Sequence, residues 1–200
     1  QSRSSAASDV YKRQLLMSSR GLFQGANFVN SIEESNQNEL KPLIESGKKS
    51  FKGRELSGGT LGVVGMGAIG SKVADMGVML GMNVIGYDPA ITVEAAWKLP
   101  NKVERKESIE DVFKESDYIS LHVPANDKTK GLINSDLLSK AKKGLRLINF
   151  ARDEIVVSKD IIDSLDKSIL SKYITDFADL ELISRAKTLS DVIILSLIHI

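Results

Sequence analysis

The sequence predicts an α/β fold in which helices cover both faces of a doubly wound parallel sheet. From Thr60 onward, short apolar segments of strand length alternate with segments whose apolar residues have helical spacing. Strands separated by helices are typical of parallel sheets, and their right-handed crossovers favour a doubly wound arrangement. A glycine-rich turn, residues 65–70 (GMGAIG), follows the first strand and opens a helix.

The expected elements follow one another without an internal repeat or a low-complexity tract. Residues 15–32 are compatible with a helix, whereas residues 36–52 are polar and loop-like. Ser108, with Asp111 three residues later, is a helix N-cap signature. In chain order, the expected strands are 60–65, 83–87, 118–122, 146–150, 172–177 and 191–194, and the expected helices are 71–80, 108–116, 135–141 and 158–165.

The composition argues against several classes of function. The 200 residues carry 27 Lys and Arg against 26 Asp and Glu, so the charge of +1 gives no sign of nucleic-acid binding. Without cysteine there is neither a disulfide nor a thiolate metal site, and we predict no bound metal. No apolar run approaches the roughly 18 residues of a membrane helix, and no secretory signal is visible. We therefore expect a cytoplasmic protein that binds no membrane.

The two ends of the sequence resemble translated sequencing adapter rather than protein. A common transposase adapter encodes residues 4–14 (SSAASDVYKRQ) in one reading frame, and its reverse complement encodes residues 195–200 (LSLIHI). We expect residues 1–14 to be adapter-derived and to have no fold, and residues 195–200 to be adapter-derived as well. His199 falls in the second segment and is assigned no role.

The glycine-rich turn has the G-x-G-x-x-G pattern of a dinucleotide-binding site. Gly65 permits the tight turn, Gly67 lets the backbone approach a pyrophosphate, and Gly70 allows the helix to pack closely on the strand. The helix N-terminal amides around Ala68 and Ile69 would then meet the phosphate charge. The alternative is that three glycines serve an ordinary strand-to-helix turn.

An acidic residue at the end of the next strand strengthens the dinucleotide interpretation. Asp88 lies 18 residues after Gly70. A carboxylate at this place accepts hydrogen bonds from the ribose hydroxyls and repels a 2′-phosphate, so it favours NAD over NADP. The predicted fold is therefore a Rossmann-type NAD-binding domain.

Four blocks of sequence resemble the D-isomer-specific 2-hydroxyacid dehydrogenases. They are residues 54–70 (RELSGGTLGVVGMGAIG), 117–132 (DYISLHVPANDKTKGL), 147–156 (LINFARDEIV) and 172–177 (KYITDF). Their order and spacing are those of the family, and the resemblance covers nearly all of residues 15–194. The phosphoglycerate dehydrogenases look most similar, from the strings LLMSSRGLF and NFARD.

The resemblance implies a catalytic set. Arg152 would bind the substrate carboxylate, as the planar fork of an arginine suits it, although a surface salt bridge is the alternative. Glu181 would be the carboxylate that supports a catalytic histidine, although it could be a solvated loop residue. The histidine itself is expected in a Pro-His pair after the last strand, and we expect it to be absent from this chain. Asp153, where Gly is common, predicts an altered turn rather than a dead site.

The resemblance also implies further contacts with the cofactor. His122 belongs to a His-x-Pro turn on the adenosine side, where a structural role is expected. Asp176 would accept a hydrogen bond from the nicotinamide amide. The remaining cofactor-binding residues expected from the resemblance are Val123, Pro124, Phe150, Ala151 and Arg152.

The predicted organisation is a helix and dimerisation arm over residues 15–52 and an NAD-binding domain over residues 53–194, with the substrate domain largely missing. The implied activity of the full-length parent is NAD-dependent oxidation of D-3-phosphoglycerate to 3-phosphohydroxypyruvate, the first step of serine biosynthesis. The fragment itself is expected to be inactive, and the coenzyme domain is expected to form a homodimer. Alternatives are another D-2-hydroxyacid dehydrogenase, acting on glyoxylate, hydroxypyruvate or lactate, and a non-catalytic NAD(H)-sensing corepressor-like protein.

Overall fold

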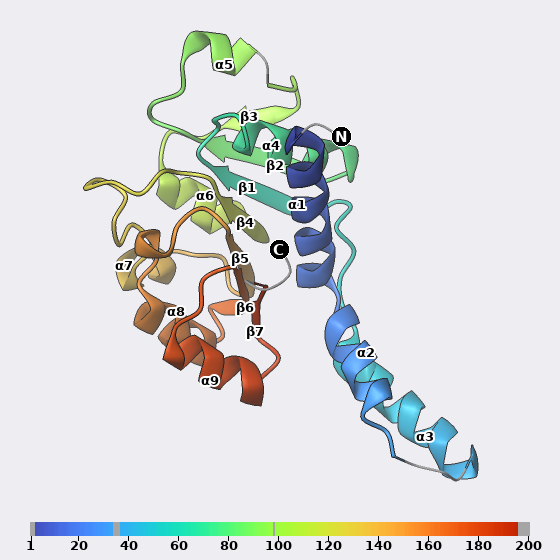
Figure 1. Cartoon of the computed structure of the whole chain (residues 1–200). Helices are drawn as coiled ribbons and strands as arrows, with labels where there is room; N and C mark the ends of the chain where they lie inside the picture. The colour runs from blue at the N-terminus through green and yellow to red at the C-terminus, as the bar shows by residue number, and fades with distance from the viewer. Residues whose placement is uncertain (1–2, 34–36, 98, 196–200) are drawn as a thin grey trace.

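A parallel sheet with the strand order β3-β2-β1-β4-β5-β6-β7 forms the centre of the molecule (Figure 1). The structure, a computed structural model, describes residues 3–33, 37–97 and 99–195. This sheet confirms the predicted doubly wound fold class. Its strands are β1 (Thr60–Val64), β2 (Asn83–Tyr87), β3 (Val103–Arg105), β4 (Tyr118–Leu121), β5 (Leu145–Asn149), β6 (Leu170–Thr175) and β7 (Val192–Ile194).

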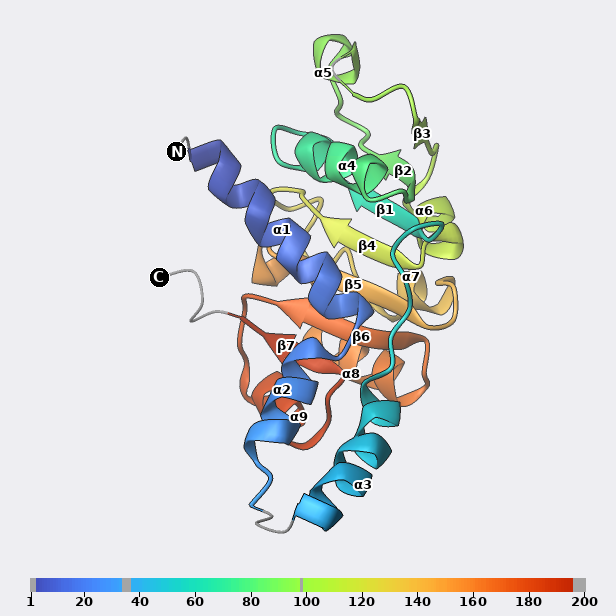
Figure 2. The same ribbon diagram turned by 90° about the vertical axis from the view of Figure 1, so that its right-hand side faces the viewer.

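Helices cover both faces of the sheet because side chains alternate between two apolar layers. The helices are α1 (Arg3–Ser19), α2 (Leu22–Asn30), α3 (Gln37–Lys48), α4 (Gly70–Met79), α5 (Val93–Trp97), α6 (Ile109–Glu115), α7 (Ser135–Ser139), α8 (Ser158–Asp166) and α9 (Leu180–Thr188), with short 3-10 turns η1 (Lys49–Phe51) and η2 (Asp153–Ile155). The layer with α1 and α4 packs on residues such as Tyr118 and Ile148, and the layer with α6 to α9 on Ile119 and Leu147 (Figure 2).

The strand order reverses between β1 and β4, which are hydrogen-bonded neighbours. In open α/β sheets, ligands bind outside the carboxyl ends of the strands at such a reversal. Gly65 follows β1, His122 follows β4 and Asp88 follows β2, so the topology brings three predicted cofactor residues to one edge of the sheet.

The expectation that residues 1–14 have no fold is wrong for the part that the structure describes. Helix α1 begins at Arg3, and Tyr11 and Leu15 are both buried in the layer that it shares with α4. The reason is that Tyr11 lies one helical turn before Leu15, so the two side chains share the face turned to the sheet. Gln14 is fully buried, yet neither of its side-chain amide atoms has a hydrogen-bond partner in the part of the chain that the structure describes. Residues 196–200 lie outside the described part.

The expectation of a loop over residues 36–52 is also wrong. Residues 37–48 form α3, which lies beside α2 in an arm that projects from the sheet (Figures 1 and 2). Ile44 of α3 and Phe28 of α2 line the same apolar groove, and the Phe28 ring lies against Gly47. Apolar residues one turn apart thus give α3 a face for α2, even though most of its residues are polar. Among the described helices, none combines the length and apolarity needed to cross a membrane.

Candidate dinucleotide and substrate site

The three glycines of the turn differ in what surrounds them. A Cβ on Gly70 would lie 1.9 Å from the Gly65 carbonyl oxygen, and a Cβ on Gly65 would lie 2.7 Å from the His122 carbonyl oxygen. Gly65 also has a φ of 92°, a conformation that favours glycine. A Cβ on Gly67, in contrast, would have no neighbour within 4 Å. Gly65 and Gly70 therefore serve the fold, whereas Gly67 leaves open space over the backbone, as a pyrophosphate requires.

Asp88 is held at the rim of this turn. Its Oδ2 accepts a hydrogen bond from the Met66 backbone N–H (2.8 Å), and its Oδ1 accepts one from the Ala90 backbone N–H (2.8 Å). The carboxylate is half-buried, so it remains accessible from the edge of the sheet. Beside it lies a cavity of about 280 Å³ with a largely apolar lining: Met66, Gly86, Asp88, Ile91, Ala96, Leu99, Pro100, Asn101, Val103 and Arg105.

His122 is built into the fold at the end of β4. Its Nε2 is 2.8 Å from the Ser120 Oγ, and the Tyr11 ring meets its ring edge-on, with 4.9 Å between centroids. Burial lowers the pKa of His122 to about 4. A histidine that is neutral at physiological pH and packed in this way suits the structural role expected for it. Val123 is half-buried, and Pro124 is exposed with its carbonyl accepting a hydrogen bond from Thr129 Oγ1 (2.5 Å).

Asn149 shapes the turn that carries Arg152. The side chain is fully buried at the end of β5, where Oδ1 accepts a hydrogen bond from the Ala151 N–H (3.1 Å) and Nδ2 donates one to the Arg152 carbonyl (2.9 Å). Arg152 is exposed, and its Nη1 donates to the Ala151 carbonyl (2.6 Å). Asn149 is not among the site residues expected from the sequence, although an Asn at the end of an apolar strand is a signal of a buried polar side chain that needs hydrogen-bond partners.

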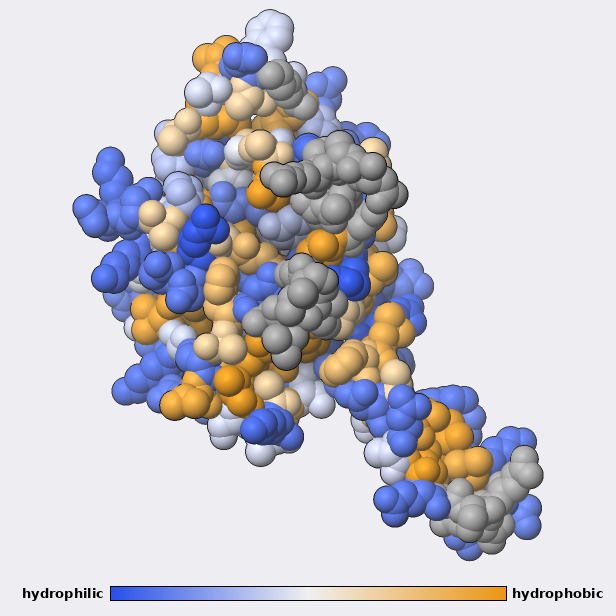
Figure 3. Space-filling view, in the orientation of Figure 1, coloured by the Kyte–Doolittle hydropathy of each residue, from blue (hydrophilic) through white to orange (hydrophobic). Residues whose placement is uncertain are grey.

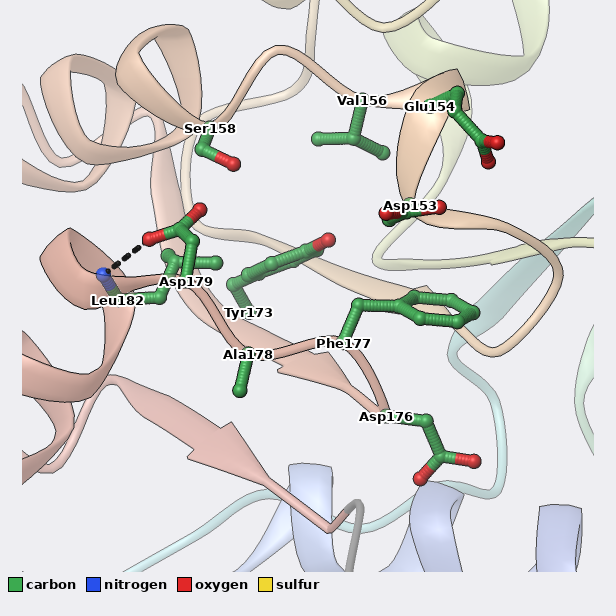
Figure 4. A pocket seen from close by; sticks show the side chains of 10 residues that line it. All are labelled: Asp153, Glu154, Val156, Ser158, Tyr173, Asp176, Phe177, Ala178, Asp179 and Leu182. Atoms are coloured by element: carbon green, nitrogen blue, oxygen red, sulfur yellow. Dashed lines mark hydrogen bonds between the residues drawn. The ribbon is translucent and has the colours of Figure 1, made fainter.

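A second cavity, of about 510 Å³, lies between the end of β6, the start of α9 and the 3-10 turn η2 (Figure 4). Asp179 caps α9 by accepting a hydrogen bond from the Leu182 N–H (2.8 Å). In Figure 4, Asp176 lies on the far side of Phe177 from Asp179. The lining residues are Asp153, Glu154, Val156, Ser158, Tyr173, Asp176, Phe177, Ala178, Asp179 and Leu182.

The structure brings most of the predicted site residues to one edge of the sheet but leaves Glu181 apart. Phe150 and Asp176 follow β5 and β6, next to the turn with Arg152. Glu181 is exposed in the first turn of α9 and does not line the cavity in Figure 4. Asp153 begins the 3-10 turn η2. Within the described part of the chain, no cluster of His, Asp or Glu could hold a metal ion.

The comparison with known proteins places this geometry in one family. Residues 6–196 match the family described as D-isomer specific 2-hydroxyacid dehydrogenase, NAD binding domain. Since the match covers nearly the whole chain, it includes the glycine-rich turn, Asp88, Arg152 and Asp176.

Individual relatives have three different activities. The D-3-phosphoglycerate dehydrogenase of Bacillus subtilis is 36% identical over 68% of this chain and 26% of its own length. The hydroxypyruvate reductase of Thermotoga maritima is 41% identical over 58% of this chain and 37% of its own length. The structure of the D-lactate dehydrogenase from Aquifex aeolicus, complexed with NAD and lactic acid, matches with a TM-score of 0.64 and 30% identity, over 79% of this chain and 52% of that one. The chain thus spans about half or less of the length of these relatives.

Proposed function

Because the chain belongs to the D-isomer-specific 2-hydroxyacid dehydrogenases, as their NAD-binding domain, we propose that its parent protein oxidises D-3-phosphoglycerate to 3-phosphohydroxypyruvate, the first step of serine biosynthesis. One observation carries the proposal: the open backbone at Gly67 lies with Asp88 at the same edge of the sheet as the Arg152 turn. A dinucleotide and a small acid could therefore meet at this edge.

The residues around the glycine-rich turn fit the dinucleotide. Backbone amides near Gly67 would hold the pyrophosphate, and Asp88 would accept hydrogen bonds from the ribose hydroxyls. Phe150 and Ala151 would line the nicotinamide ring, and Asp176 would accept from its amide. When bound, NAD supplies the acceptor for the hydride that leaves C2 of the hydroxy acid.

Arg152 would bind and orient the substrate. Its guanidinium is exposed, always charged and shaped to bind a carboxylate through two hydrogen bonds. Asn149 acts as a positioning residue, since it fixes the turn from which Arg152 extends. The histidine that would take the hydroxyl proton is expected to follow β7 in the parent protein and to be absent from this chain, and Glu181 would hold the orientation of that histidine.

A second candidate function is reduction of hydroxypyruvate or glyoxylate. It is favoured by the similarity to the hydroxypyruvate reductase, whose identity of 41% is no lower than the 36% to the phosphoglycerate dehydrogenase. Arg152 serves either activity, because both substrates carry a carboxylate beside the reacting carbon. The residues that recognise a phosphate would decide between the two.

We propose further that the parent protein is cytoplasmic and forms a homodimer through the coenzyme domain. The support for the dimer is the arm of α2 and α3, on which apolar side chains gather (Figure 3). Leu22 is 58% exposed and Phe23 is 50% exposed, and large exposed apolar patches commonly mark protein interfaces.

The test is steady-state turnover of the purified full-length parent with NAD. Activity on D-3-phosphoglycerate that exceeds activity on D-lactate and D-glycerate supports the proposal. Loss of this activity in Arg152→Met would show that turnover depends on the Arg152 guanidinium. A parent that binds NADH but turns over none of these acids would contradict it and favour a cofactor-sensing protein. A preference for D-glycerate would favour the second candidate.

A further inference from the structure

The amino ends of three neighbouring strands carry an unusual pair of cations, far from the edge that holds the glycine-rich turn. Tyr118 of β4 pairs in register with Arg146 of β5, and Arg146 pairs with Lys172 of β6. In a parallel sheet, residues paired in register point to the same face. The three side chains therefore form one row, on the face covered by α1.

The two cations in this row have no counter-charge. Arg146 and Lys172 are both half-buried, and within the described part of the chain neither has an ion pair or a hydrogen bond with a carboxylate. Burial and the positive charge of Arg146 both lower the pKa of Lys172. Charged side chains are rarely buried without a partner, because desolvation and repulsion then oppose folding.

Two carboxylates at the amino ends of neighbouring strands are engaged with other partners. Asp117, which precedes β4, forms an ion pair with Lys142 (2.7 Å) and accepts a hydrogen bond from the Thr60 N–H (3.0 Å). Asp191, which precedes β7, forms hydrogen bonds with the Arg185 guanidinium through both of its oxygens. Each of these carboxylates therefore already has a cation of its own.

Two polar atoms in the same row are buried and have no hydrogen-bond partner among the residues that the structure describes. The Tyr118 side chain is only 1% exposed, and its hydroxyl forms no hydrogen bond. The Arg146 Nε is likewise buried without an acceptor. The guanidinium lies over the Tyr118 ring, 5.1 Å from its centroid, and this contact satisfies the face of the guanidinium but none of its N–H groups. A buried donor without an acceptor is rare in native proteins, and a bound water or ion is one of the partners that can satisfy it.

We propose that this row binds a small dianionic oxyanion of the phosphate type. Arg146 would donate to two of its oxygens, Lys172 would add a second charge, and the Tyr118 hydroxyl would donate a hydrogen bond. Arg54, exposed in the segment that leads into β1, adds positive charge near Tyr118. Figure 2 shows this segment running along the amino ends of the strands. The site is separate from the dinucleotide edge and independent of the proposed activity.

The direct test is NMR of the whole chain titrated with inorganic phosphate at constant ionic strength, following the Arg146 Nε–H signal, assigned by its absence in Arg146→Gln. The expected result is a saturable shift of this signal by phosphate or sulfate but not by chloride or acetate. A signal that does not move, or that moves equally with chloride, would overturn the proposal.

Thermal unfolding in phosphate against chloride provides the second measurement. Phosphate also reaches the glycine-rich turn, so the informative quantity is the difference between variants. Lys172→Gln should weaken the apparent affinity roughly tenfold, and Tyr118→Phe should weaken it while keeping the contact of the ring with Arg146. The control is Lys159→Gln, an exposed lysine on α8, which should keep the full phosphate response. Equal responses in Lys172→Gln and the control would count against the site.

Discussion

At the scale of single residues, Asp88 has a structural role in the turn and an expected role in cofactor choice, and one substitution with two measurements distinguishes them. Its carboxylate accepts a hydrogen bond from the Met66 N–H and is accessible at the rim of the turn. Asp88→Ser removes the negative charge that would repel a 2′-phosphate, so the affinity for NADPH relative to NADH should rise roughly tenfold or more.

Titration of the folded variant with NADH and NADPH measures this ratio. Loss of the Met66 hydrogen bond should cost only about 1 kcal/mol of stability. Asp163→Ser, an exposed substitution on α8, is the matched control and should leave the ratio unchanged. A ratio that stays the same in Asp88→Ser would remove Asp88 from the ribose site.

His122 should make the stability of the chain depend on pH. Its pKa is about 4 in the folded chain, against an ordinary value of 6.5. Between these values the unfolded chain binds more protons, so stability is lost as the pH falls from about 6.5 to 4, by about 3 kcal/mol in total. Urea unfolding should show that the wild type loses about this much more than His122→Gln between pH 7 and pH 4. Parallel losses in the two proteins would mean that the fold does not lower the pKa of His122.

At the scale of elements, the turn after β5 depends on one buried side chain. Asn149→Ala leaves the Ala151 N–H and the Arg152 carbonyl without their partner, which should cost about 2–3 kcal/mol of unfolding free energy. Asn83→Ala, which removes one exposed hydrogen bond to the Gly58 carbonyl, should cost less than about 1 kcal/mol. Urea denaturation of both variants gives the comparison, and equal losses would show that Asn149 does not organise the turn.

The elements that the sequence predicts correctly are those with a strong apolar pattern. Residues 83–87 form β2 as expected, and Ser108 caps α6 by accepting a hydrogen bond from the Asp111 N–H (3.1 Å). The short edge strand β3 was not expected, since only three residues pair with β2 and the apolar pattern is too brief to show. Helix α9 was not expected either. Most of its residues are polar and only Leu182 is buried, so the sequence shows no clear apolar face after the Asp179 cap.

The part of the candidate site that depends on local sequence patterns was predictable, and the part that depends on contacts formed in the folded chain was not. The glycine turn and Asp88 depend on local backbone geometry, which sequence spacing records directly. The role of Asn149 depends on a hydrogen-bonding pattern formed only after β5 is buried. The role of Glu181 is implied by the family resemblance alone, and in the structure Glu181 lies in the first turn of α9, where it is exposed.

At the scale of the whole molecule, the arm of α2 and α3 should control assembly. If its exposed apolar side chains form the dimer interface, Phe23→Asp should shift the chain from dimer to monomer in sedimentation velocity experiments. Val93→Asp, a substitution at a residue of α5 that is 75% exposed, should leave the dimer intact. A monomeric wild-type chain, or a Phe23→Asp variant that remains dimeric, would place the interface elsewhere.

The central claim is that the turn from Gly65 to Gly70 holds NAD, and NADH titration followed by fluorescence tests it most directly. The folded chain should bind NADH saturably. Gly67→Val should abolish binding while leaving the Tm nearly unchanged, because a Cβ at this position has no neighbour within 4 Å and the side chain would fill the path of the pyrophosphate. A folded wild-type chain that binds no NADH, or a Gly67→Val variant that binds it equally well, would contradict the account.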